Sequence, residues 1–182
     1  DNQLQHSSYK GRLNGIPAKG TDYALVCQAA LDLNEVTLDP EWLQFAYRVH
    51  KQMNKNLRNP KTGFIIESGA ALYPKAYPVY YAFNLSLIDN DSTWALAHSN
   101  AKRLSLQVND DLLDEQVTQL EGLVLQNSQL SAIASIDYLT REAMARSARC
   151  YIKPPIDDAM LTMVRNNPCQ IVALSESGTY PE

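Results

Sequence analysis

Three carboxylates occupy positions from which they could perform acid–base chemistry. Asp22 lies at the start of a helical pattern, Glu35 lies near its end, and Glu67 closes a short β-prone run. Acid–base catalysis often uses two cooperating carboxyl groups, so we take Asp22 and Glu67 as the candidate catalytic residues, with Glu35 as another source of the second carboxylate. The simpler interpretation is that Asp22 caps a helix and that both glutamates are solvated.

Aromatic side chains form a second candidate feature, because a sugar ring could stack on them. The patch comprises Trp42, Tyr73, Tyr77, Tyr80 and Tyr81. Asn84 follows one turn later in an otherwise apolar stretch, so its side chain must find a hydrogen-bond partner or contact a ligand. Aromatics at helical spacing also fill cores and interfaces, which is the competing interpretation. We take Trp42, Tyr77, Tyr80, Tyr81 and Asn84 as candidate ligand-binding residues.

Neither the cysteines nor the histidines form a recognisable metal or redox motif. The cysteines Cys27, Cys150 and Cys169 lie far apart with no Cys-x-x-Cys pair, so neither a disulfide scaffold nor a zinc set is supported. Cys27 falls in an apolar helical stretch, where a free cysteine packs as a small hydrophobe. His50 and His98 fall on helices among polar neighbours, and we expect both imidazoles to be exposed. We predict no metal and no cofactor.

Composition excludes several classes of partner. The chain has 182 residues, is 45% hydrophobic and carries a net charge of −4, so it can bury a core but offers no basic field for nucleic acid. Its longest apolar run, Tyr77 to Ile88, falls short of the roughly 18 to 20 residues of a membrane helix. We expect a soluble protein with no nucleic-acid or membrane partner. Because the chain begins with Asp1, we expect that its front end was processed or cut away. The compartment does not follow from the sequence, although the cytoplasm is favoured over others.

Two helices must position the first candidates. The residues up to 20 are polar and glycine-rich, which indicates a loop or an extended lead-in. A helix should then run to about Val36, with Thr21 or Asp22 as its N-cap. Asp39 and Pro40 are typical of a new helix start, and the apolar stripe that follows extends to about Leu57. The short connection predicts an antiparallel hairpin.

The pattern then repeats. A short strand is predicted in a loop at Phe64–Glu67, and a second hairpin should pair an inner helix over 78–88 with an outer helix over 93–108. Two more helices are expected over 112–126 and 130–147. Beyond Ala148 the periodicity changes to strand, helix and strand, over 149–153, 155–165 and 169–174. Such a β-α-β unit has parallel strands and a right-handed crossover.

Several stretches resemble the helical region of the YyaL-type thioredoxin-domain proteins, relatives of the spermatogenesis-associated thioredoxin-like proteins. They match in order and spacing, and they are Ser8-Tyr-Lys-Gly-Arg12, Gly20-Thr-Asp-Tyr-Ala24, Ala29 to Thr37, Asp39-Pro-Glu-Trp-Leu43 and Gly63-Phe64. The tail from Ala148 to Leu174 resembles the α/β segment with which that family ends. One difference follows Glu67, where this chain keeps a Gly-Ala pair but lacks the family's Asp and its Pro-Ser-x-Asn order.

The resemblance implies a fold. The family's helices resemble six-hairpin toroids, the (α/α) barrels of many glycosidases and N-acylglucosamine epimerases, behind a thioredoxin-like domain that this chain lacks. A closed ring needs about twelve helices and the periodicity supplies about six, so we expect a fragment or a lone half. The expected fold class is mainly α: antiparallel helical hairpins of a partial six-hairpin glycosidase-like toroid over residues 1–147, with a small C-terminal α/β unit over 148–182.

The resemblance also implies a function. Asp22 and Tyr23 would face the mouth of the ring, which adds Tyr23 to the ligand-binding candidates. The leading hypothesis is a cavity that binds a small carbohydrate-like ligand, either without catalysis or as a glycosidase or sugar epimerase. The alternative is a non-catalytic helical scaffold that binds a partner protein. A third hypothesis is a homodimer in which the open faces of the incomplete ring cover each other.

Overall fold

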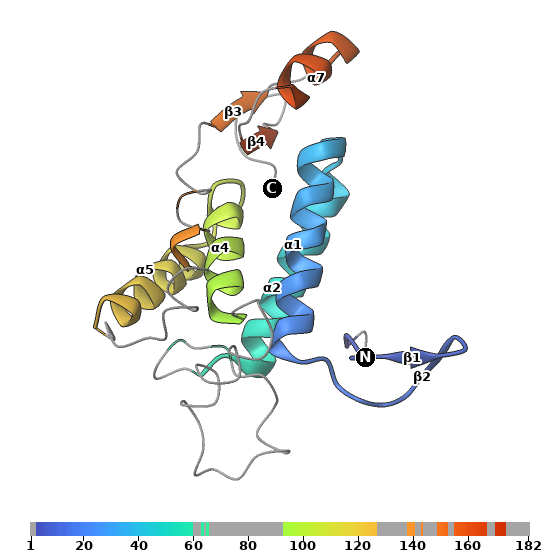
Figure 1. Ribbon diagram of the computed structural model, residues 1–182, viewed down its shortest axis with the longest axis vertical. Coiled ribbons are helices and arrows are strands. Elements are labelled where there is room, and N and C mark those ends of the chain that lie inside the picture. The colour runs from blue at the N-terminus through green and yellow to red at the C-terminus, as the bar shows by residue number, and fades with distance from the viewer. Residues whose placement is uncertain are drawn as a thin grey trace.

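The computed structural model describes residues 3–59, 63, 65, 93–126, 138–140, 143, 149–152, 155–166 and 170–173. Most of these residues lie in helices (Figure 1), which confirms the prediction of a mainly α chain. The helices are α1 Gly20–Thr37, α2 Pro40–Leu57, α4 Thr93–Ser105, α5 Asp111–Gln126 and α7 Asp158–Arg165. The strands are β1 Ser8–Tyr9, β2 Arg12–Leu13, β3 Arg149–Ile152 and β4 Gln170–Ala173. In this part of the chain no helix is long and apolar enough to cross a membrane.

Helices α1 and α2 are antiparallel neighbours joined by a two-residue break. Leu38 adopts a left-handed backbone with a φ of 59°, and the Asp39 side chain then accepts a hydrogen bond of 2.9 Å from the next helix's first turn. The contacts show that the two helices run in opposite directions. The Cys27 thiol donates to the Ala46 carbonyl, and Tyr23, which lies earlier in α1, contacts Asn56, which lies later in α2. The bounds predicted for α2 are confirmed. The buried side chains of α1 include Tyr23, Cys27, Ala30, Leu31 and Asn34, which lie on one face of the helix.

Helix α4 is the central helix of the described part. It runs parallel to α1, since Thr21 contacts Thr93 near the start of both helices and Glu35 contacts Arg103 near the end of both. Nearly all of its residues are buried, because small side chains let neighbouring helices approach on several sides. The prediction of an outer helix over 93–108 is therefore wrong in position. The predicted range is also too long. Helix α4 ends at Ser105, because the backbone N–H groups of Gln107 and Val108 both donate to the Leu104 carbonyl in a turn.

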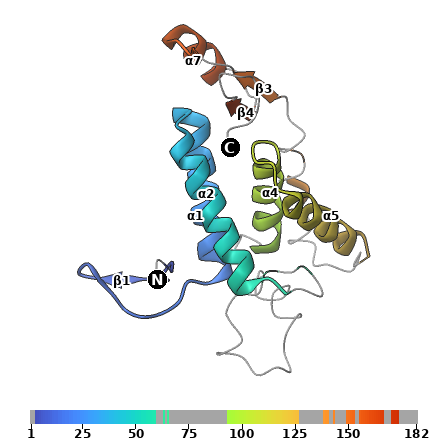
Figure 2. The same ribbon diagram turned by 180° about the vertical axis from the view of Figure 1, so that it is seen from behind.

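Helices α4 and α5 form the second antiparallel pair. His98 and Lys102 face Glu121, whereas Leu104 and Leu113 share the core near the connection. Helix α5 begins one residue earlier than predicted. In both views α1 and α4 run in the same direction, whereas α5 crosses α4 obliquely (Figures 1 and 2). The predicted inner helix over 78–88 lies outside the described residues.

The core lies between these four helices. It contains one large aromatic side chain from α1 and mainly aliphatic side chains from the others. Its most buried members are Tyr23, Leu31, Met53, Ile65, Leu96, Leu104 and Leu113. Ile65, the one described residue of the predicted Phe64–Glu67 run, forms an isolated antiparallel bridge with Arg58.

Short strands occur at both ends of the chain. Near the N-terminus, where a loop or extended lead-in was expected, β1 and β2 pair antiparallel and project from the helices (Figure 1). Near the C-terminus, β3 and β4 pair in parallel with α7 between them, which confirms the predicted β-α-β unit. Helix α7 begins at Asp158, three residues later than predicted. Of the helix predicted over 130–147, the structure describes only 138–140 and 143, which are helical.

Candidate functional site

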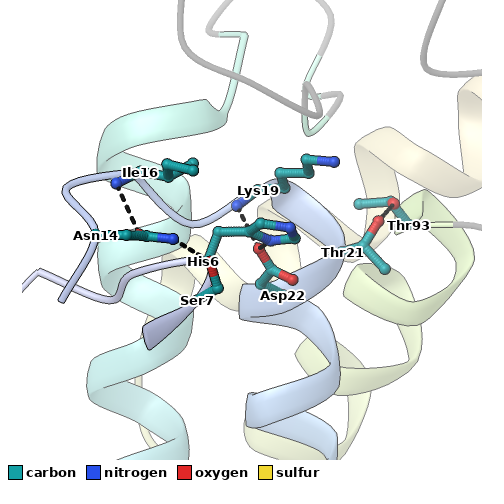
Figure 3. A network of polar contacts seen from close by, with 8 residues as sticks. All are labelled: His6, Ser7, Asn14, Ile16, Lys19, Thr21, Asp22 and Thr93. Carbon is teal, nitrogen blue, oxygen red and sulfur yellow. Dashed lines mark hydrogen bonds and ion pairs between the residues drawn. The ribbon is translucent and has the colours of Figure 1, made fainter. Parts of the chain in front are cut away.

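The candidate site lies at the N-terminal end of α1, where Asp22 makes two contacts. The Lys19 backbone N–H donates to Asp22 Oδ2 over 2.8 Å, and His6 Nδ1 lies 2.7 Å from the same oxygen (Figure 3). Lys19 is the N-cap, with an extended backbone, so Asp22 stands at the third helical position. The prediction that Thr21 or Asp22 is the N-cap is therefore wrong. Asp22 still caps the helix by reaching back, because its carboxylate satisfies an otherwise orphaned N–H beside the positive end of the dipole.

The His6–Asp22 pair has the geometry of an acid–base dyad. An ionised carboxylate only accepts hydrogen bonds, so Nδ1 of His6 carries the proton of this contact, and in the tautomer whose Nε2 is bare that nitrogen can act as a base. Among the described residues, the hydrogen bond of the His6 ring is the one at Nδ1. The side chains are 38% and 26% exposed, so a ligand can reach both. This arrangement can take a proton from a hydroxyl group, or return one to it.

The surrounding contacts fix the pair in place. The Thr21 and Thr93 hydroxyls lie 2.7 Å apart and join the starts of α1 and α4. The Asn14 side chain donates to the Ser7 hydroxyl and accepts from the Ile16 backbone N–H at 3.1 Å, as Figure 3 shows. These bonds order the segment that follows His6 and the first turn of α1 beside it. The pair is therefore held by the folded N-terminal segment and not by α1 alone.

Sequence reasoning found Asp22 but missed His6. The two residues are sixteen positions apart, and only the β1–β2 hairpin brings His6 back alongside α1. The signal for that hairpin was the Lys10-Gly11 pair between two short extended runs, because two residues with positive φ favour a tight hairpin turn.

The structure does not bring the other described candidates to Asp22. Tyr23 is buried in the core, where its hydroxyl accepts a bond of 3.4 Å from Asn56. Trp42 is half-buried and packs edge-to-face on Phe45. In the antiparallel register Trp42 lies near the level of Leu31, about 14 Å along α1 from Asp22. The remaining candidates, Glu67, Tyr77, Tyr80, Tyr81 and Asn84, lie outside the described residues.

Glu35 serves an ion pair between helices. Its carboxylate accepts two bonds from Arg103, at 2.7 and 3.2 Å, and Arg103 also lies 2.8 Å from Asp32. Thirteen residues separate Glu35 from Asp22 on one helix, which is about 20 Å. The two carboxyl groups of a glycosidase pair are separated by at most about 9.5 Å. Glu35 therefore cannot be the second carboxylate beside Asp22.

A seam of polar side chains joins α2 to α5. Tyr47 donates to Asp110 over 2.6 Å, His50 Nε2 lies 3.0 Å from Gln116 Oε1, and the amides of Asn54 and Gln116 exchange two bonds. The expectation that His50 is exposed is wrong, because the ring is fully buried. Burial lowers the pKa of His50 to about 4, so the ring is neutral.

His98 is also buried, against expectation. Its ring lies against Tyr138, and its Nε2 is 3.4 Å from Glu121 Oε1. Burial opposes ionisation of Glu121, but Lys102 at 2.8 Å and His98 together outweigh it and lower the pKa of this carboxyl. Both histidines were misjudged because polar side chains from α5, far along the chain, cover them.

The described cysteines are two free thiols. Cys27 and Cys150 are free, and burial raises the pKa of the Cys27 thiol to about 12, so it remains an unreactive thiol. Among the described residues no group of three or more His, Cys, Asp or Glu is placed to hold a metal ion. No protein-family model matches the chain, and no curated protein is significantly similar to it.

Proposed function

We propose that this chain is a helical toroid region of a YyaL-like protein and that it binds a small carbohydrate-like ligand at the N-terminal end of α1. The observation that carries the proposal is the His6–Asp22 pair, an oriented and partly exposed carboxylate–imidazole dyad. Sugar hydroxyls both donate and accept hydrogen bonds, so one hydroxyl can donate to the carboxylate while another donates to the bare imidazole nitrogen.

The arrangement of the helices supports the toroid part of the proposal. In a ring of helical hairpins, successive inner helices are parallel neighbours and each is antiparallel to its outer partner. Helices α1 and α4 are parallel neighbours, and each has an antiparallel partner, α2 or α5. The parallel β3-α7-β4 unit supports the division at about residue 148, because the family tail would have this order.

The enzymatic version assigns roles to the dyad. His6 would be the general base, Asp22 would orient it and stabilise the imidazolium, and Glu67 would supply the second carboxyl group of a glycosidase or sugar epimerase. The tyrosines Tyr77, Tyr80 and Tyr81 would provide a stacking surface, with Asn84 as a hydrogen-bonding group. Tyr23 and Trp42 would support the site through packing, given their positions in the fold.

Calorimetric titration of the whole chain with glucose, mannose and N-acetylglucosamine tests the proposal. We expect one of these sugars to bind and the Asp22→Asn variant to bind it at least about tenfold more weakly, because a hydrogen bond to a charged group contributes about 1.5–3 kcal/mol. His6→Gln should weaken binding without removing the helix cap. Glu41→Gln, which neutralises an exposed carboxylate on α2, is the matched control. Equal affinity of the Asp22 and control variants would refute the assignment.

A second candidate function, the non-catalytic scaffold, is favoured by one face of α1. Leu25, Leu33 and Val36 are exposed on the same side of this helix. An apolar stripe of this kind suits a helix from a partner protein or from another copy. Hydrogen exchange separates the hypotheses: a scaffold in contact with another copy gains amide protection along α1 as protein concentration rises, whereas a sugar protects the segment around His6.

A further inference from the structure

The N-terminal hairpin projects from the helical body as an arm. Residues 6–17 are all exposed, and β1 and β2 extend away from α1 in both views (Figures 1 and 2). Each strand has two residues, and an isolated two-stranded hairpin is marginally stable at best in water. Two large side chains on this arm are nevertheless uncovered, with Tyr9 72% and Leu13 71% exposed. The arm therefore has the composition of a segment that packs against another surface.

The base of the arm is fixed to the protein. An isolated bridge pairs Gln5 with Pro17, the His6 N–H donates to the Ile16 carbonyl over 2.9 Å, and the Ala18 N–H donates to the Leu4 carbonyl over 3.2 Å. The His6–Asp22 contact then ties this base to the first turn of α1 (Figure 3). These bonds hold the arm in an outward direction, so its tip points away from the helices and is accessible to another molecule.

The tip of the arm is basic and aromatic. Tyr9 and Arg12 are directly opposite in the strand register, so their side chains share a face, and Lys10 Nζ lies 5.3 Å from the Tyr9 ring centroid. Lys10 has a φ of 50°, a conformation that costs a residue with a side chain about 1–2 kcal/mol. A glycine would avoid that cost, but it would remove a cation from the tip. The surface complementary to this tip is acidic, with an apolar group among the acids.

The chain itself carries such a surface on α5. Asp111, Asp114 and Glu115 are exposed on its first two turns, and Leu112, which is 57% exposed, lies among them. Glu115 is 3.6 Å from Arg58 but remains largely exposed. We call these four residues the α5 acidic face. The arm and α5 lie on opposite sides of the molecule in both views, so the arm cannot reach the acidic face of its own chain (Figures 1 and 2).

We propose that the arm docks on the α5 acidic face of a second copy of this chain. Lys10 and Arg12 pair with the acids, while Tyr9, which shares a face with Arg12, covers Leu112. Reciprocal docking of both arms gives a two-fold dimer in which each chain contributes the same two surfaces. The contact is small and charged, so the dimer is weak and sensitive to salt. This proposal is independent of sugar binding, because it does not require the Asp22 site to be occupied.

A charge-exchange experiment tests the pairing of these two surfaces. The arm variant carries Lys10→Glu and Arg12→Glu, and the α5 variant carries Asp111→Lys and Asp114→Lys. In a homodimer of either variant, each arm has the same sign of charge as the α5 face it meets, so both contacts are repulsive. In the mixed dimer, each arm meets an α5 face of opposite charge, so both contacts are attractive. By sedimentation velocity of the full chain, we expect the wild type to dimerise and each variant to dimerise at least about tenfold more weakly. The equimolar mixture should recover the wild-type dimer.

The control separates specific docking from total charge and from misfolding. Arg48→Glu with Lys55→Glu on α2 reverses two exposed cations, like the arm variant, and should leave the dimer unchanged. Circular dichroism should give the same helical content for every variant. A wild type that stays monomeric at all concentrations would overturn the proposal, and the arm would then serve another acidic protein. Failure of the mixture to recover the dimer would overturn the assignment of α5 as the docking face.

Discussion

His50 should make the stability of this protein depend on pH in a narrow window. The ring is fully buried, and its Nε2 lies 3.0 Å from Gln116 Oε1. The Gln116 amide group donates to Asn54, so its oxygen is the acceptor and His50 Nε2 carries the proton. Nδ1 is consequently a bare, buried nitrogen without a hydrogen-bond partner within the described ranges. Protonation of Nδ1 would place an unpaired charge in the interior, and burial accordingly lowers the pKa from 6.5 to about 4.

The size of the effect follows from the two pKa values. Between 6.5 and about 4 the unfolded state binds the proton and the folded state does not, so stability falls as pH falls through this window. Above the unfolded value the contribution of His50 is fully present. Lowering the pH from about 7 to about 5 should remove about 2 kcal/mol of the free energy of unfolding, and the whole window corresponds to about 3 kcal/mol.

Urea unfolding of the wild type and His50→Gln at several pH values measures this effect. The variant should be less stable at about pH 7, because a shorter amide replaces a packed ring, but the difference between the proteins should shrink towards about pH 5. Gln44→Asn is the control, since this exposed side chain on α2 does not titrate and the variant should keep the wild-type slope. If the free energy of unfolding changed with pH in the same way for the wild type and His50→Gln, the conclusion that a neutral, buried His50 sets the pH dependence would be refuted.

Three further substitutions test individual parts of the fold by chemical denaturation. Asp39→Ala should destabilise the protein by about 1 kcal/mol, because the cap at the start of α2 loses its acceptor, and an unchanged midpoint would contradict that role. Gly63→Ala should cost at least about 1 kcal/mol, since φ is 74° and the new methyl carbon would clash with the Gln119 side chain; a gain in stability would contradict this packing. Arg103→Met should cost about 1–3 kcal/mol by leaving Glu35 without its cation, and the loss should shrink when Glu35 is also replaced by Gln.

The helices that follow local rules could be predicted from the sequence. Asp39 and Pro40 define the start of α2, and the apolar stripe defines its length, because both signals lie within the helix. The β-α-β unit was predictable for the same reason, as its strand and helix periods are short and distinct. By contrast, the end of α4 at Ser105 depends on a turn onto Leu104 that the apolar pattern does not mark.

Long-range contacts account for what the sequence did not reveal. His50 is covered by Gln116, which is 66 positions away, and polar residues from another helix are invisible to a periodicity analysis of one helix. The parallel packing of α1 and α4 could not be predicted either, because it depends on contacts between distant segments. These contacts are made by small side chains on α4 and by the Arg103 ion pairs. For the candidate site, Asp22 was identifiable by its place at a helix start. His6 was not, because only the hairpin brings it there.

The central claim is that the His6–Asp22 pair is a ligand site, and chemical-shift mapping tests it most directly. Two-dimensional NMR spectra of the whole chain would be recorded during titration with each of the three sugars. The account predicts saturable shifts centred on His6, Lys19 and Asp22, and their loss in Asp22→Asn. Saturable shifts confined to the exposed stripe of α1, or no shifts around His6 with any of these sugars, would contradict it.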